Sequence, residues 1–160
     1  MSKTEAQITL AVDAMGGDQG PKEVLAGVSK AVMVSPRNTN FLLFGQEEVL
    51  GKIIEEDVNL STNQVTVRHA PEIVGMDEKP IAGIKGKKNS SMSLALNALK
   101  EGEADALLSC GNTGCLMAGS AIRLRTLEGV ERPALCTIWP GRERYFTLLD
   151  AGANPHAKPY

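Results

Sequence analysis

Short apolar runs alternate with amphipathic stretches along the chain. Runs rich in apolar and β-branched residues predict strands at 8–12, 41–44, 65–67, 104–109, 134–138 and 147–150. Between these runs, apolar residues recur at the spacing of one helix face. This spacing predicts helices that begin near residue 21, near residue 49, at residue 90 or 91, and after residue 114.

The alternation of strands and helices indicates the α/β class. Apolar strands separated by helices are typical of a mainly parallel sheet that is covered on both faces. Residues 70–89 differ, because they hold two prolines, three glycines and four lysines with little periodicity. We predict a long irregular loop there, with room for a short helix. In parallel sheets ligands collect at the carboxyl ends of the strands, so the loops that follow strands are the places to look for chemistry.

Composition narrows the class of protein. The 160 residues suffice for one domain, and 42% apolar with 22% charged residues is typical of a soluble globular protein. A net charge of −2 argues against general nucleic-acid binding. No apolar run is long enough to span a bilayer, and the first residues lack the apolar core of a secretory signal. The odd number of cysteines indicates a reducing compartment.

The loop after the first predicted strand is a candidate anion cradle. It contains Gly16, Gly17 and Asp18 and leads into the helix that begins near Pro21. Glycines let backbone N–H groups approach an anion closely, and a helix N-terminus adds partial positive charge. The alternative is a tight turn in which Asp18 caps the helix. The glycine spacing matches neither the dinucleotide-binding fingerprint nor the P-loop.

A second loop of the same kind follows the strand at 104–109. It contains Gly111, Asn112, Thr113 and Gly114 and leads into a helix. Small residues, an amide and hydroxyls at a helix N-terminus are what a tetrahedral oxyanion requires. The alternative is a structural turn in which Asn112 or Thr113 caps the helix. Because both loops follow strands of one parallel sheet, they can face one crevice, which strengthens the prediction of an anion site.

Two other segments hold weaker candidates. Lys79, Lys87 and Lys88 could neutralise a phosphate or bind an acidic partner, although each alone also fits a solvated run of charge. Asp150 and Asn154 follow the last predicted strand and could hydrogen-bond a substrate. The cysteines have no histidine near them in the sequence, so a zinc site is not expected, and buried packing is favoured over a reactive role.

Five motifs occur in a fixed order along the chain. They are V-D-A-M-G-G-D-x-G-P, K-K-x-S-S-M, E-G-E-A-D-A-L-L-S-x-G-N-T-G, R-P-A-L and L-L-D-A-G-A-N. Together they resemble the PlsX family, the phosphate acyltransferases of bacterial phospholipid synthesis. The resemblance runs from Ile8 to Tyr160, and the two long glycine-containing blocks are hard to match by accident.

The resemblance implies that an acyl group passes from acyl-[acyl carrier protein] to inorganic phosphate, which gives acyl phosphate. It implies a three-layer α/β/α fold like that of isopropylmalate dehydrogenase, a homodimer, and no metal or organic cofactor. It also implies a place in the cytoplasm, with peripheral association with the inner membrane face, where a membrane acyltransferase takes the product. Family members are longer, so we expect residues 1–160 to be the N-terminal part of a single α/β/α domain.

The resemblance and the loops together suggest a site. Phosphate would lie on the backbone N–H groups of residues 111–114, with Asn112 and Thr113 as side-chain donors and the first loop closing over it. Asp13 or Asp18 would orient a donor, and Lys79, Lys87 or Lys88 would supply positive charge. The predicted catalytic residues are Asp13, Asn112 and Lys88. The predicted binding residues are Gly16, Gly17, Asp18, Ser91, Gly111, Thr113, Gly114, Asp150 and Asn154.

Two other interpretations stay open on the sequence. One is an NAD-dependent decarboxylating dehydrogenase of the related fold, which does not use the dinucleotide-binding fingerprint. The other is a non-catalytic fragment that only binds phosphate or a partner.

Overall fold

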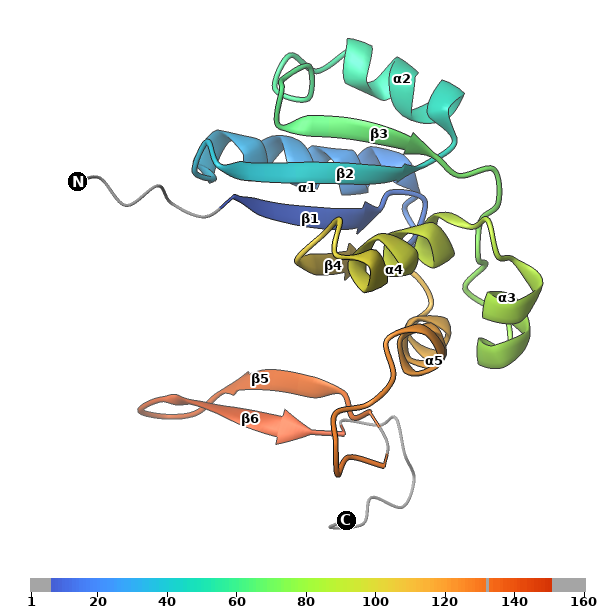
Figure 1. Ribbon diagram of the computed structural model, residues 1–160. Helices are drawn as coiled ribbons and strands as arrows, with labels where there is room; N and C mark the ends of the chain where they lie inside the picture. The colour runs from blue at the N-terminus through green and yellow to red at the C-terminus, as the bar shows by residue number, and fades with distance from the viewer. Residues whose placement is uncertain (1–6, 132, 151–160) are drawn as a thin grey trace. The chain divides into compact units, whose positions relative to one another are not determined.

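The computed structural model describes residues 7–131 and 133–150 (Figure 1). The chain divides into two compact units, residues 1–124 and residues 125–160. The first unit contains β1 (Ile8–Asp13), α1 (Pro21–Val34), β2 (Thr39–Gly45), α2 (Glu47–Glu55), β3 (Val65–His69), α3 (Pro80–Gly86), α4 (Ser91–Glu101), β4 (Ala106–Ser109) and α5 (Thr113–Arg123). The second contains β5 (Cys136–Pro140) and β6 (Tyr145–Leu149).

The first unit is built on a parallel sheet with the strand order β3-β2-β1-β4. Side chains of a strand alternate between its two faces. On one face, Val12 and Leu43 pack with Leu25 of α1 and Leu50 of α2. On the other face, the neighbouring strand residues pack against α4, as the cluster of Ala11, Phe44, Ala95 and Ala98 shows. Helices therefore cover both faces (Figure 1), and the predicted α/β class with a mainly parallel sheet is confirmed.

Local signals in the sequence explain where the helices start and stop. Pro21 occupies the first turn of α1, where its missing N–H costs nothing. Ser90 caps α4, since its hydroxyl oxygen accepts from the N–H of Ser93 at 3.2 Å. Gly102 ends the same helix in the left-handed conformation, with φ of 75°. The position that caps α1 is Gly20, without a side-chain hydrogen bond, so the alternative in which Asp18 caps this helix is wrong.

The two ends of the predicted irregular segment at 70–89 are joined by hydrogen bonds. Glu72 and Ser90 form an isolated parallel bridge, and the Glu72 carboxylate accepts from the N–H of Asn89 at 2.8 Å. Between these residues the chain makes an excursion that contains α3, the short helix for which the sequence left room. The segment is thus a closed loop with its own internal contacts.

The second unit is described by its hairpin, in which β5 and β6 pair antiparallel and form a sheet of their own. Their positions agree with the predicted strands at 134–138 and 147–150, with shifts of about two residues at the ends, as is usual for such predictions. That residues 1–160 belong to a single domain stays a prediction. No helix in the described part of the chain has the length and apolar character needed to cross a membrane.

Candidate anion site

The two predicted glycine loops meet at the carboxyl edge of the parallel sheet. β1 and β4 are neighbours, and their last residues, Asp13 and Ser109, lie opposite each other. A Cβ atom added to Gly16 would stand 2.6 Å from Asp13 Oδ2 and 2.9 Å from the backbone nitrogen of Gly111. Gly17 has φ of 106°, which glycine adopts without strain. The prediction that both loops face one place is confirmed, and the contact is close enough to require glycine at position 16.

Asp13 lies beneath these loops, with only 2% of its surface exposed. The Ser109 hydroxyl donates to Oδ2 of Asp13 at 2.7 Å and accepts from the backbone N–H of Gly111 at 3.0 Å. The other carboxylate oxygen, Oδ1, is buried without a hydrogen-bond partner among the described residues. Asp13 therefore fixes the second loop through Ser109, and it keeps one buried acceptor unused, which is costly in a folded protein.

The second loop ends in Asn112, which caps α5. Its Oδ1 accepts from the N–H of Cys115 at 3.0 Å, so of the two capping residues expected for a structural turn, Asn112 is the one that caps this helix. Its Nδ2 lies 3.2 Å from the carbonyl oxygen of Gly75, 2.7 Å from that of Met76 and 3.0 Å from that of Glu78. Both N–H bonds of the amide are therefore engaged within the chain, whereas a side-chain donor to phosphate was expected at this position.

The N-terminus of α5 still offers backbone donors. The first turn of a helix has N–H groups that the helix itself cannot pair, and Thr113 and Gly114 are the first two residues of α5. Thr113 is exposed. Partial positive charge gathers at this end of the helix, so the site suits an oxyanion.

Glu78 and Lys87 hold the excursion between β3 and α4 together. The Lys87 ammonium contacts Oε1 of Glu78 and donates to the carbonyl oxygen of Ile73 at 2.7 Å. The N–H of Gly75 donates to the same Glu78 oxygen at 2.7 Å. The hydrogen bond from Lys87, followed by that from Gly75, holds the pKa of the Glu78 carboxyl below its ordinary value. Lys87 is thus engaged in an ion pair, while the predicted Lys88 is exposed.

The excursion also packs directly on α5. A Cβ atom added to Gly83 of α3 would stand 3.0 Å from Sγ of Cys115, and one added to Gly114 would stand 2.8 Å from Cγ of Pro80. Cys115 is fully buried, and this burial raises the pKa of its thiol. The expectation that it packs rather than reacts agrees with this environment.

Four further residues were predicted for the site, namely Asp18, Ser91, Asp150 and Asn154. Asp18 is exposed. Ser91 is buried as the first residue of α4, and its N–H donates to the carbonyl oxygen of Glu72 at 3.1 Å. Asp150 follows β6 with φ of 60° and belongs to the second unit. Asn154 lies outside the described residues.

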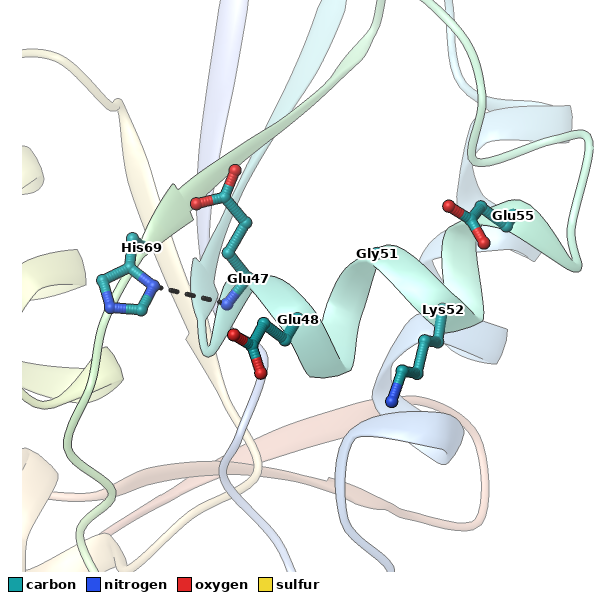
Figure 2. Close-up of a pocket in the computed structure, with 6 residues that line it drawn as sticks. All are labelled: Glu47, Glu48, Gly51, Lys52, Glu55 and His69. Carbon is teal, nitrogen blue, oxygen red and sulfur yellow. Dashed lines mark hydrogen bonds between the residues drawn. The ribbon is translucent and has the colours of Figure 1, made fainter.

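An open pocket of about 560 Å³ lies along α2, and none of its lining residues is a predicted site residue. Figure 2 shows its lining, with His69 at one end, where Nδ1 accepts from the N–H of Glu47 at 3.4 Å. The lining also includes Glu48 and Glu55, against a single lysine, Lys52. This excess of carboxylates is unfavourable for an anion, so we do not assign the phosphate to this pocket.

Ser109 and Glu78 contribute to the site but are not among the predicted site residues. Ser109 matters because strand register places it opposite Asp13, and register between strands far apart in sequence is not visible in a single sequence. Glu78 matters because its carboxylate pairs with Lys87 and so holds the excursion together. Each residue had a sequence signal, because Ser109 opens the S-x-G-N-T-G part of its motif and Glu78 lies in a segment rich in lysines.

Comparison with known proteins agrees with the motifs. Residues 8–160 match the family model described as "Fatty acid synthesis protein". The chain belongs to this family. It is 44% identical over 150 residues to a phosphate acyltransferase of Thermoanaerobacterium thermosaccharolyticum, an alignment that covers 94% of this chain and 43% of the relative. It is 45% identical over 150 residues to the phosphate acyltransferase of Azorhizobium caulinodans, with 93% of this chain and 42% of the relative covered.

A third relative, the phosphate acyltransferase of Coxiella burnetii, is 43% identical over 153 residues, with 94% of this chain and 44% of the relative covered. The chain thus spans less than half the length of the curated relatives it matches. The predicted PlsX resemblance is confirmed at the level of the family.

Proposed function

We propose that this chain is part of a phosphate acyltransferase and that the place where its two glycine loops meet binds inorganic phosphate. The observation that carries the proposal is the contact between Gly16 and Gly111, at the carboxyl ends of adjacent parallel strands and beside the N-terminus of α5. This geometry offers backbone donors and helix charge with little side-chain bulk. The names of the relatives support the reaction.

In this reaction an oxygen of phosphate attacks the thioester carbonyl carbon of acyl-[acyl carrier protein]. The carbon–sulfur bond breaks, the carrier leaves as a thiolate that takes up a proton, and acyl phosphate remains. Phosphate is already anionic, so the protein mainly has to hold it in line and stabilise the developing oxyanion. Phosphate would lie on the N–H groups of Thr113 and Gly114, with Lys88 supplying positive charge.

Asp13 and Asn112 take positioning roles in this proposal. Asp13 holds Ser109 and, through it, Gly111, so it sets the position of the second loop. Asn112 ties the start of α5 to the carbonyl oxygens of residues 75, 76 and 78. The donors at the helix N-terminus are therefore fixed before phosphate arrives, which lowers the cost of ordering them.

The partners follow from the proposed reaction. The acyl group would come from acyl carrier protein, and the acyl phosphate would pass to a membrane acyltransferase of phospholipid synthesis. We propose a cytoplasmic homodimer that associates with the inner face of the membrane.

The test compares two glycine substitutions in the whole protein that contains this chain. Gly16→Ala places a Cβ where Asp13 Oδ2 and the Gly111 nitrogen already lie, whereas Gly27→Ala in α1 meets nothing within 4 Å. Acyl phosphate formed from acyl-[acyl carrier protein] is trapped as a hydroxamate at increasing phosphate concentrations. We expect Gly16→Ala to raise the KM for phosphate at least tenfold, on the order of the strain of overpacking, and Gly27→Ala to leave it unchanged.

Thermal unfolding of both variants shows whether they are folded. A folded Gly16→Ala protein with the wild-type KM for phosphate would remove the loops from the site. Absence of acyl phosphate from the wild-type protein would refute the proposed function itself.

A further inference from the structure

The outward face of α3 concentrates positive charge on an otherwise slightly acidic chain. Lys79, Lys85 and Lys88 are exposed in and around this helix, against one exposed acid, Asp77. Of the other charges in the segment, Glu78 and Lys87 neutralise each other in the ion pair, and the half-buried Glu72 carboxylate accepts from the N–H of Asn89 where the two ends of the segment meet. The chain as a whole carries a net charge of −2, so this is a local reversal of sign.

Apolar side chains are exposed among these lysines. Ile81 has 59% of its surface exposed and Met76 has 43%. Ile81 and Lys85 are four positions apart, so they lie on the same side of the helix. We call Met76, Lys79, Ile81, Lys85 and Lys88 the α3 face. Exposed apolar side chains with polar residues beside them are typical of a protein-interaction site.

The same helix is firmly attached to the proposed phosphate site by its other side. Ile84 is buried in a cluster with Met92, Leu96 and Cys115, so α3 cannot turn its apolar side outward without losing this core. The Cγ atom of Pro80 would lie 2.8 Å from a Cβ on Gly114, one of the proposed phosphate-binding residues. A partner bound to the α3 face would therefore lie next to the N-terminus of α5.

We propose that the α3 face is the docking surface for the protein that carries the acyl group, and that this carrier presents acidic side chains to it. The proposal rests on the proposed function, since that function supplies a protein-borne substrate. Charge complementarity sets the sign of the partner surface, and Ile81 and Met76 supply the apolar contact. Docking here brings the thioester next to the phosphate proposed at the N-terminus of α5.

An anionic membrane surface is the other partner that exposed lysines could bind. The α3 face favours a protein for two reasons. It exposes only two apolar side chains, too few for the broad apolar stripe of an interfacial helix. It also adjoins the site where the thioester has to arrive, an arrangement that a lipid surface does not require.

The experiment measures binding of fluorescently labelled acyl carrier protein to the whole protein by anisotropy, alongside the KM for acyl-[acyl carrier protein]. The variants are Lys85→Glu and Ile81→Ala, both at exposed positions where folding is not at risk. Lys30→Glu in α1, also an exposed lysine in a helix, is the matched control. We expect Lys85→Glu to weaken binding and raise the KM about tenfold, with a shallower dependence on salt, and Ile81→Ala to weaken binding about threefold.

The KM for phosphate and the kcat should not change, because neither residue contacts the proposed phosphate site. Equal carrier affinity for the wild type, Lys85→Glu and Ile81→Ala would overturn the docking proposal and leave the proposed function intact. Loss of binding to vesicles of phosphatidylglycerol in Lys85→Glu, with unchanged carrier affinity, would overturn it in favour of a membrane contact. Absence of acyl phosphate from the wild-type protein would instead refute the function, while the binding measurement would still test the docking surface.

Discussion

The side chain of Asn112 makes four hydrogen-bond contacts in the candidate site. It is 8% exposed, its amide donates toward three carbonyl oxygens of residues 75–78, and its Oδ1 caps α5. An NH₂ group has two N–H bonds, so one of the three contacts is shared. At about 1 kcal/mol net for each hydrogen bond, the amide contributes about 2 kcal/mol, and the cap contributes about 1 kcal/mol.

Two substitutions separate these contributions. Asn112→Ala removes the amide and the cap, and it should lower the free energy of unfolding by about 3 kcal/mol. Asn112→Ser removes the amide but keeps a hydroxyl that can cap a helix, and it should cost about 2 kcal/mol. Urea unfolding of both variants and the wild type, with the slope m unchanged, measures the two differences.

The refuting result is specific. A loss below about 0.5 kcal/mol for Asn112→Ala would show that the contacts to residues 75–78 do not hold the excursion on α5, since surface substitutions commonly stay within that range. Equal losses for Ala and Ser would show that the cap contributes nothing. The first outcome would remove Asn112 as the positioning residue of the proposed site, whereas the second would leave its role to the amide contacts alone.

Two further predictions concern the surroundings of α5. The pKa of Glu78 in the folded state lies below its ordinary value of 4.5. Its ion pair therefore stabilises the folded state fully above pH 4.5. This stabilisation is lost as the pH falls through the lower pKa of the folded state. Glu78→Gln should therefore be less stable than the wild type at pH 7, with the gap in urea midpoints closing below about pH 4.5; a constant gap would contradict the ion pair. The buried Cys115, with its raised thiol pKa, should resist iodoacetamide at pH 8 until the protein unfolds, whereas the exposed Cys110 should react promptly. Both cysteines lie in one tryptic peptide, residues 101–123, so fragment-ion mass spectrometry of that peptide is needed to distinguish them. Equal labelling of both in the folded protein would place Cys115 outside the core.

The sequence predicted only part of the arrangement around α3, where some lysines are exposed and one is paired. The lysines and the short helix of 70–89 were visible as a basic segment with little periodicity. Which lysine is paired and which are exposed depends on the fold of the excursion, because Lys87 reaches Glu78 and Ile73 only after the chain turns back on itself.

The sequence by itself determined the elements and the class of fold. Short apolar runs predicted β1 and β2. Pro21 marked the start of α1, and Ser90 and Gly102 marked the two ends of α4. These signals are visible in the sequence because each acts on the residues next to it. The ordered motifs identified the family, since glycine loops after strands retain their spacing in the sequence.

Only the tertiary structure decided how the site is held. It placed Ser109 opposite Asp13, left Asp13 Oδ1 buried without a partner among the described residues, and engaged the amide of Asn112 with residues 75–78. These relations join residues 34 to 96 positions apart. Strand register and the path of a long excursion set such distances, and neither follows from the local preferences that a single sequence reveals.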